Sequence, residues 1–248
     1  MTHVSLFSGI GGLDLAAEWA GFETVLFCER DPYCQKVLAK HWPGVPIIDD
    51  IRSVTRDSYR GPIDVISGGF PCQPHSLAGK RKGNDDERFL WPEMLRAIRE
   101  LTPAWVIAEN VPGIISDGTA DRACGELESQ GYEVVPVVSP AFAYGAGFEG
   151  YRIFLIASSE GCGHGRLPGE KCRKPLRELV EDKLEGYTSW GEAERRIVQN
   201  IRRKETLPAD IRGDYGFSDW VDRLRALGNS VVPQQAYPIF KAIREASR

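Results

Sequence analysis

Short apolar runs alternate with longer amphipathic stretches along the first 158 residues of the chain. The short runs are rich in Val, Ile and Phe, which is typical of buried strands, whereas the longer stretches place apolar residues at helical spacing. Strands are expected at residues 3–8, 24–29, 45–48, 63–69, 104–110, 133–139 and 151–158. Helices are expected at residues 13–22, 32–42, 89–101 and 121–132. This alternation predicts an α/β fold with a mostly parallel seven-stranded sheet and helices on both faces.

The pattern changes after residue 158. Residues 159–220 are rich in glycine, charges and turn formers and show only weak helical periodicity, so a small irregular region is expected there. Residues 221–248 return to a strong amphipathic pattern, and their apolar helix face needs a core to cover. The sequence therefore predicts a discontinuous main domain, residues 1–158 and 221–248, with residues 159–220 inserted into it.

Composition narrows the class of protein. The chain has 248 residues, 42% of them hydrophobic, which is enough for one sizeable core. No apolar run approaches the roughly 20 residues that span a membrane, and the first residues lack the pattern of a secretory signal. The six cysteines form no CxxC pair, so reduced thiols are expected. A soluble cytoplasmic protein without a membrane partner is the expectation.

The formal net charge of −4 does not favour nucleic-acid binding, because dedicated binding domains usually carry a basic excess. The distribution of charge leaves the possibility open. Residues 166–204 hold eleven Lys and Arg against seven Asp and Glu, and residues 80–82 form a second basic cluster. A solvated surface is the ordinary interpretation of such runs, and contact with phosphates is the alternative.

Distinctive residues follow the predicted strands at their carboxyl ends, where parallel sheets bind their ligands. The first strand leads into a Gly-rich turn at residues 7–12, which lacks both the GxGxxG spacing of dinucleotide folds and a Lys-Ser/Thr phosphate cradle. By itself this turn is equally well explained as a plain tight turn. Glu29 after the second strand is placed to bind ribose hydroxyls, and Asp50 after the third could accept from an adenine amino group. Together they indicate an adenosine ligand.

Two further positions have candidate chemistry. Cys72 lies in GGFPCQPHS, where two glycines and a proline impose a defined loop, and basic residues nearby favour thiolate character. Glu109 ends a strongly apolar strand, where a carboxylate is costly unless it is paired or functional. It could hold a proton or accept hydrogen bonds from a planar ring. The structural alternatives are a buried small side chain for Cys72 and a satisfied acid for Glu109.

These motifs, and the order in which they follow one another along the chain, resemble those of the DNA cytosine-5 methyltransferase family. They span nearly the whole chain outside residues 159–220. The matching segments are FSGIGGLDLA, Glu29, Asp50-Ile51, GGFPCQPHSLAGKRKG, Glu109-Asn110-Val111, YRIFLIA and Arg223 through GNSVV. The resemblance implies S-adenosylmethionine as the cofactor and double-stranded DNA as the partner. It implies methyl transfer to carbon 5 of a cytosine, which must be flipped out of the duplex.

The resemblance also assigns roles to individual positions. Cys72 is expected to add to carbon 6 of cytosine, Glu109 to hold the ring at N3 and the exocyclic amine, and Arg152 to contact the pyrimidine oxygen. Residues 76–88 are expected to form a loop that closes over the base. The implied cofactor site comprises Phe7, Gly9, Gly11, Glu29, Asp50, Ile51, Pro71, Leu90, Asn229 and Val231.

The chain departs from the family in two places. The family commonly has Gln-x-Arg-x-Arg before the seventh strand, where this chain has Phe148-Glu149-Gly150-Tyr151-Arg152, so only the last Arg is kept. Two residues that usually orient the pyrimidine ring and support the loop are therefore missing. The short region at residues 159–220 matches the family's target-recognition region and implies a short or loosely read DNA site, or help from a partner. A monomer is expected, with a cognate restriction endonuclease as a possible partner.

Other functions agree less well with these residues. A non-catalytic binding protein would be free to lose Cys72 or Glu109, and a nicotinamide-dependent oxidoreductase disagrees with the glycine spacing and the PCQ loop. An RNA cytosine methyltransferase, which some relatives of the family are, is not excluded. Cys162, His164 and Cys172 have irregular spacing and no clear fourth ligand, so no metal site is predicted.

Overall fold

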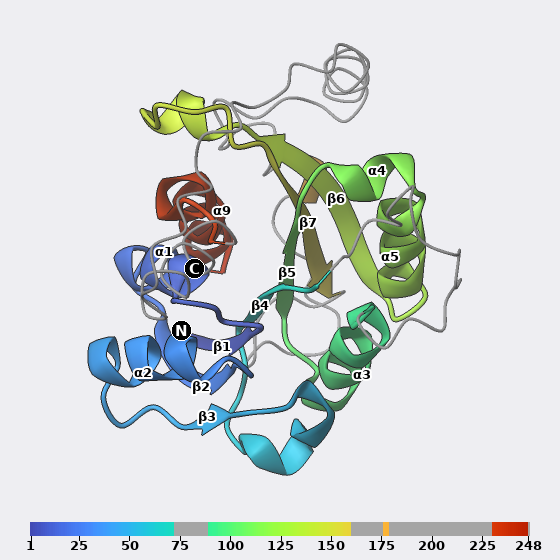
Figure 1. Cartoon of the computed structure of the whole chain (residues 1–248). Coiled ribbons are helices and arrows are strands. Elements are labelled where there is room, and N and C mark those ends of the chain that lie inside the picture. Colours follow the sequence, from blue (N-terminus) through green and yellow to red (C-terminus); the bar gives the residue numbers. More distant parts are fainter. Residues whose placement is uncertain (72–88, 160–175, 179–229, 248) are drawn as a thin grey trace, which may run out of the picture.

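A computed structural model of the chain describes residues 1–71, 89–159, 176–178 and 230–247 (Figure 1). Its strands form one seven-stranded sheet in the order β3-β2-β1-β4-β5-β7-β6. The strands are β1 (Thr2–Leu6), β2 (Glu23–Cys28), β3 (Ile47–Ile48), β4 (Val65–Gly69), β5 (Trp105–Asn110), β6 (Tyr132–Ser139) and β7 (Arg152–Ser159). β1 to β5 are parallel, whereas β7 runs antiparallel to both β5 and β6. The predicted mostly parallel sheet of seven strands is confirmed.

Helices cover both faces of the sheet, as the alternating pattern predicts. α1 and α9 lie together on one face, where Ala16 and Phe240 are fully buried, and α3 and α5 cover the other, where Trp91 and Leu127 are fully buried (Figure 1). The α-helices are α1 (Gly12–Trp19), α2 (Pro32–His41), α3 (Trp91–Leu101), α4 (Gly113–Ser116), α5 (Thr119–Glu128) and α9 (Pro233–Ala246). Short 3-10 helices are η1 (Ile51–Ser53), η2 (Arg56–Ser58) and η3 (Ala141–Tyr144).

Several element boundaries differ from the expected ones for local reasons. The first strand ends at Leu6 because Phe7 takes a φ of 53°, which no strand residue has. The first helix ends at Trp19, and Gly21 follows it with a φ of 82°. The helix expected over residues 121–132 begins earlier and is preceded by the short α4, because Gly118 with a φ of 79° separates the two.

The carboxyl-terminal helix packs back onto the sheet. The Phe240 ring of α9 makes edge-on contacts with His3 of β1, 5.4 Å between centroids, and with Phe22, 5.6 Å. This burial gives the apolar face of α9 the cover that its pattern requires. The proposed division of the chain at residues 159–220 stays a prediction, because most of that region lies outside the described residues. None of the helices described is long and apolar enough to cross a membrane.

Candidate active site

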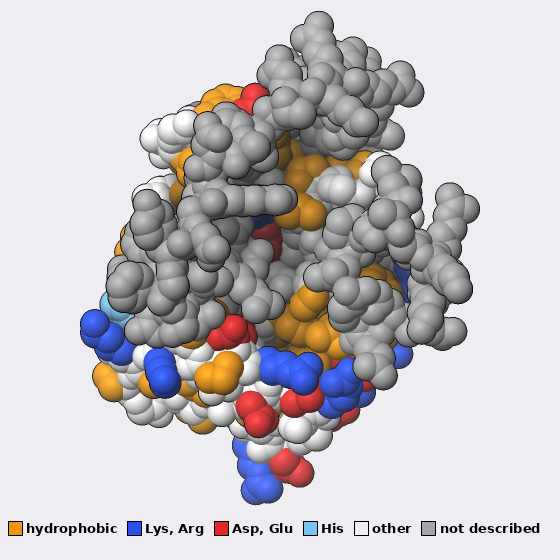
Figure 2. Space-filling model, in the orientation of Figure 1, with side chains coloured by type: hydrophobic (Ala, Val, Ile, Leu, Met, Phe, Trp, Pro, Cys, Tyr) orange, Lys and Arg blue, Asp and Glu red, His pale blue; other side chains and the backbone are white. Residues whose placement is uncertain are grey.

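The carboxyl ends of β1, β2, β4 and β5 meet along one rim of the sheet, as parallel pairing requires. This rim carries the glycine turn after β1, Glu29 after β2 and Glu109 at the end of β5. β7 runs the opposite way, so its first residue, Arg152, lies at the same rim, beside the Asn110–Ile153 pair of β5 and β7. Figure 2 shows a hollow in the molecule in which acidic and basic side chains are visible.

Close packing explains the glycine-rich turn between β1 and α1. A Cβ on Gly11 would lie 2.5 Å from the Trp42 ring, and a Cβ on Gly12 would lie 2.7 Å from the carbonyl oxygen of Val231. Gly11 also has a φ of 88° and provides no side-chain cap for α1. The structure thus brings Val231, predicted from the far end of the chain, against the turn. The uncapped amides that begin α1 favour a negatively charged group there.

Glu29 fixes the shape of this turn. One carboxylate oxygen accepts from the Gly9 amide at 2.7 Å, and the other accepts from the Asp31 amide at 2.7 Å. Asp31 in turn caps α2 through the amides of Tyr33 and Cys34. A carboxylate has about four acceptor sites, so Glu29 keeps lone pairs for a ligand after these two bonds. The predicted neighbours Gly9 and Glu29 are therefore in direct contact.

Asp50 and Ile51 form the edge of the rim after β3. The Asp50 carboxylate accepts from the Arg52 amide at 2.9 Å and pairs with the Arg52 guanidinium at 3.3 Å, and these contacts lower the pKa of Asp50. Ile51 is buried, and Leu90 at the start of α3 packs against the same core. Asp50 and Ile51 thus lie together at the start of η1, and Leu90 shares a core with Ile51.

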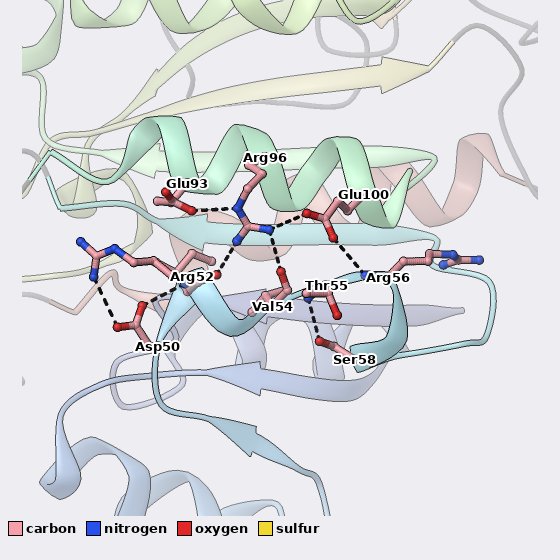
Figure 3. A network of polar contacts seen from close by, with 10 residues as sticks. Asp50, Arg52, Val54, Thr55, Arg56, Ser58, Glu93, Arg96 and Glu100 are labelled. Carbon is pink, nitrogen blue, oxygen red and sulfur yellow. Dashed lines mark hydrogen bonds and ion pairs between the residues drawn. The ribbon is translucent and has the colours of Figure 1, made fainter.

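Arg96 of α3 holds the backbone that carries Asp50 and Ile51, and sequence reasoning missed it (Figure 3). Its guanidinium donates to the carbonyl oxygens of Ile51 at 2.7 Å and Val54 at 2.8 Å. Glu93 and Glu100, on the same helix, bind the guanidinium at 2.8 and 2.7 Å and orient it. The available sequence signal was this pair of acids flanking an arginine at helical spacing.

Glu109 and Arg152 form a close ion pair at the rim. Glu109 Oε1 lies 2.9 Å from Arg152 Nε, and both side chains are largely buried. Burial raises the pKa of Glu109 to about 7, against the opposing effect of the Arg152 charge. Gly69, paired with Glu109 across β4 and β5, leaves room for this carboxylate, since a Cβ there would lie 2.7 Å from Oε2. Glu109 can therefore carry a proton near neutral pH while it faces a cation.

The chain leading to Cys72 is anchored beside this pair. The Asn110 side chain donates to the carbonyl oxygen of Phe70 at 2.8 Å and accepts from the Val111 amide at 2.9 Å. The Phe70 ring packs on the fully buried Trp91, 5.0 Å between centroids, at the start of α3. The described residues Phe70 and Trp91, on either side of the segment 72–88, are thus in contact, and Phe70 is bound to Asn110, the neighbour of Glu109 in β5; Pro71 follows Phe70 directly.

Several predicted residues are not among the described ones. The described residues do not include three single positions, Cys72, His75 and Asn229. They also exclude the segments 76–88, 166–175 and 179–204 and the group Cys162, His164 and Cys172. Among the residues described, no three potential metal ligands gather into a cluster. Burial raises the thiol pKa of Cys28 to about 12 and that of Cys124 to about 11, so neither of these is a nucleophile near neutral pH.

A buried polar cluster lies beneath the glycine turn and was not predicted. Ser5 of β1 donates to the Asp14 carboxylate of α1 at 3.1 Å, which ties the strand to the helix on either side of the turn. The His3 ring contacts the hydroxyls of Thr24 at 2.9 Å and Ser67 at 2.7 Å. These contacts join β1, β2 and β4 in the interior of the sheet.

Several known proteins are similar to this chain in sequence. A sequence model of the C-5 cytosine-specific DNA methylase family matches residues 1–216. The type II methyltransferase M.PspPI of Psychrobacter is 44% identical over 137 residues, 53% of this chain and 33% of the relative. M.FnuDI of Fusobacterium nucleatum is 33% identical over 191 residues, 73% of this chain and 55% of the relative. The chain spans about half or less of the length of most of these curated relatives.

Solved structures share the fold. A DNA modification methyltransferase encoded within an E. coli prophage superposes with a TM-score of 0.65 and 21% identity, covering 99% of both chains. The S. pombe Dnmt2 methyltransferase superposes with a TM-score of 0.65 and 14% identity, covering 99% of this chain and 98% of the other. At these identities the likeness establishes the architecture of the sheet and its helices.

Proposed function

Because the chain belongs to the C-5 cytosine-specific DNA methylase family, we propose that it transfers a methyl group from S-adenosylmethionine to carbon 5 of cytosine in double-stranded DNA. The observation that carries the proposal is the Glu109–Arg152 pair, 2.9 Å apart, beside the anchored chain that leads to Cys72. Three groups meet at one rim: an acid that can hold a proton, a cation, and the loop that carries the cysteine. These are the groups that thiolate attack on a pyrimidine ring requires.

The glycine turn and its neighbours fit the cofactor. Phe7, Gly9 and Gly11 bring backbone to the rim, and the uncapped start of α1 suits the cofactor's carboxylate. Glu29 keeps lone pairs for ribose hydroxyls, and Asp50 keeps acceptor capacity for the adenine amine. The remaining contacts are assigned to Ile51, Pro71, Leu90, Asn229 and Val231. Bound there, S-adenosylmethionine supplies an electrophilic methyl group.

The protein's own residues then carry the chemistry of the base. The Cys72 thiolate adds to carbon 6, while protonated Glu109 donates to N3 and Arg152 binds the pyrimidine oxygen, which makes carbon 5 nucleophilic. With S-adenosylmethionine bound, carbon 5 would take its methyl group and S-adenosylhomocysteine would be left. Loss of the carbon-5 proton to a base, departure of the Cys72 sulfur and return of the N3 proton to Glu109 restore the ring, the thiolate and the acid. Because a stacked base is out of reach, the cytosine must be flipped out first.

The remaining assignments complete the proposal. Residues 159–220 read the DNA sequence, and the basic residues within 166–204 contact phosphates, so DNA affinity falls steeply with salt. The protein acts as a monomer in the cytoplasm, with a cognate restriction endonuclease as the expected companion. The type II naming of several relatives supports this last assignment.

Base-resolution sequencing of 5-methylcytosine in cells that express the chain tests the proposal, with Cys72→Ala as the control. Methylation in one short context that the control lacks is the expected result. Absence of methylation, when the purified protein still binds labelled S-adenosylmethionine, would overturn DNA as the substrate and direct the same assay to RNA. Full activity in the Cys72→Ala protein would overturn the nucleophile assignment.

A further inference from the structure

Exposed apolar side chains gather at the rim that carries Glu109 and Arg152. Five large hydrophobic side chains are exposed in the part of the chain described, and three of them are at this rim: Val111 at 42%, Phe142 at 53% and Phe148 at 60%. Val111 follows Asn110, which pairs with the second residue of β7. The other two lie in the connection from β6 to β7, which projects beyond the sheet in Figure 1. Apolar side chains also border the hollow in Figure 2.

The β6–β7 connection is held firmly in place. Gln235 of α9, only 1% exposed, donates to the carbonyl oxygens of Ser139 at 2.7 Å and Gly150 at 3.0 Å. Within the connection, the Ala141 amide donates to the Glu149 carbonyl oxygen at 2.7 Å. Buried hydrogen bonds of this kind fix both ends of the connection. The exposed rings are therefore presented from an ordered backbone.

The position of Phe148 depends on Gly150. A Cβ on Gly150 would lie 2.5 Å from the Phe148 ring and 2.8 Å from Ala141 Cβ, and Gly150 has a φ of 45°. The ring thus lies directly on the glycine. These two residues occupy the places of the Gln and the first Arg in the Gln-x-Arg-x-Arg pattern, while Arg152 keeps the last place. A side chain at position 150 would displace this ring, so Phe148 in this position requires glycine at 150.

We propose that Phe148 stacks on a base of the DNA substrate next to the flipped-out cytosine. This inference rests on the proposed function. A cytosine that leaves the duplex exposes the faces of its neighbouring bases to water, and an aromatic ring covers such a face without regard to sequence. Phe148 is placed for this because it lies in the connection that leads, four residues on, to Arg152, the first residue of β7 and the partner of Glu109. Phe142 extends the same apolar edge.

A base explains the surface better than a protein partner does. The exposed apolar residues are few, and they surround the catalytic rim instead of forming a separate patch. Phe142 also contacts Tyr151 edge-on, 6.1 Å between centroids, so its ring is supported from the strand side. The Phe148 ring is likewise supported, by Gly150, and it is 60% exposed, which suits stacking on a planar base.

The test compares Phe148→Ala, Phe148→Leu and Phe148→Trp with the wild-type chain. Trp19→Ala, which removes an exposed aromatic side chain of α1, is the matched control. The measurements are the dissociation constant for a fluorescent DNA duplex, KM for DNA and KM for S-adenosylmethionine, with thermal unfolding as a check of folding. The duplex carries the methylated context that sequencing identifies, or mixed sequence where none is found.

Phe148→Ala is expected to weaken DNA binding about tenfold or more and to leave KM for the cofactor within about twofold. Phe148→Trp should restore binding, whereas Phe148→Leu, which is apolar but has no planar face, should not. Unchanged DNA affinity in Phe148→Ala would overturn the inference, and so would full restoration by leucine. A wild-type chain that binds DNA but does not methylate it would refute the proposed function alone, because the affinity comparison still decides the role of Phe148.

Discussion

Replacing Asp14 with Asn should change how the free energy of unfolding depends on pH. Asp14 is fully buried beneath the glycine turn, and its Oδ1 has no hydrogen-bond partner among the described residues. Burial raises the pKa of Asp14 to about 7. Burial also lowers the pKa of His3, whose Nδ1 lies 3.6 Å from Asp14 Oδ1, to about 3. At neutral pH the His3 ring is therefore uncharged and offers Asp14 no counter-charge.

The size and sign of the effect follow from these values. The folded chain holds the Asp14 proton more tightly than the unfolded chain does, where the pKa is 3.8. Its contribution to stability is therefore full below pH 3.8 and is lost as the pH rises to about 7. At about 1.4 kcal/mol per pKa unit, the loss between about pH 5 and about pH 8 is on the order of 3 kcal/mol. Asparagine has no proton to lose and escapes this loss.

Urea unfolding followed by circular dichroism at about pH 5, 6, 7 and 8 would measure the effect. The stability of Asp14→Asn minus that of the wild type should grow by on the order of 3 kcal/mol across this range. Other titrating groups, Glu109 included, are common to both proteins and cancel in the difference. A difference that does not vary with pH would refute the reasoning. If the stability of Asp14→Asn relative to the wild type is lowest near pH 6, Asp14 instead pairs with a charged His3.

Two further predictions concern the rim. Arg96→Ala should raise the dissociation constant for S-adenosylhomocysteine about tenfold, because it releases the Ile51 and Val54 carbonyls. Titration calorimetry would measure this change. Arg99→Gln, on the exposed face of α3, should leave the dissociation constant unchanged. Equal effects of the two variants would contradict a positioning role. Gly69→Ala should lower kcat at least tenfold with little change in cofactor affinity, because its Cβ would displace the Glu109 carboxylate. Wild-type turnover in that protein would show that the carboxylate can move at no cost.

The rim could be predicted from the sequence because its signals are local. Strand periodicity places Glu29 and Glu109 just at or past the ends of apolar runs, and parallel strands bring such ends to one edge. A charged residue after a buried strand is itself a conspicuous signal. These two facts together locate most of the candidate site without any knowledge of packing.

Contacts with the backbone could not be predicted in the same way. Arg96 binds the carbonyl oxygens of Ile51 and Val54, more than forty residues earlier in the chain, and a carbonyl leaves no trace in the sequence. The room that Gly69 leaves for Glu109 depends on how β4 and β5 are paired. The early end of β1 was missed because Phe7 takes a positive φ, which residues other than glycine seldom adopt.

The departure from Gln-x-Arg-x-Arg shows why a missing residue should not be interpreted from sequence alone. Counted position by position, the chain lacks a glutamine and an arginine that would support the ring and the loop. In the folded chain the Phe148 ring fills the space above Gly150, and Gln235 holds the backbone of Gly150 from below. The contacts at this position are therefore made by α9 and by an aromatic ring, not by two polar side chains. Arg152 still pairs with Glu109, so the acid–cation pair is intact although the chain lacks the glutamine and the first arginine.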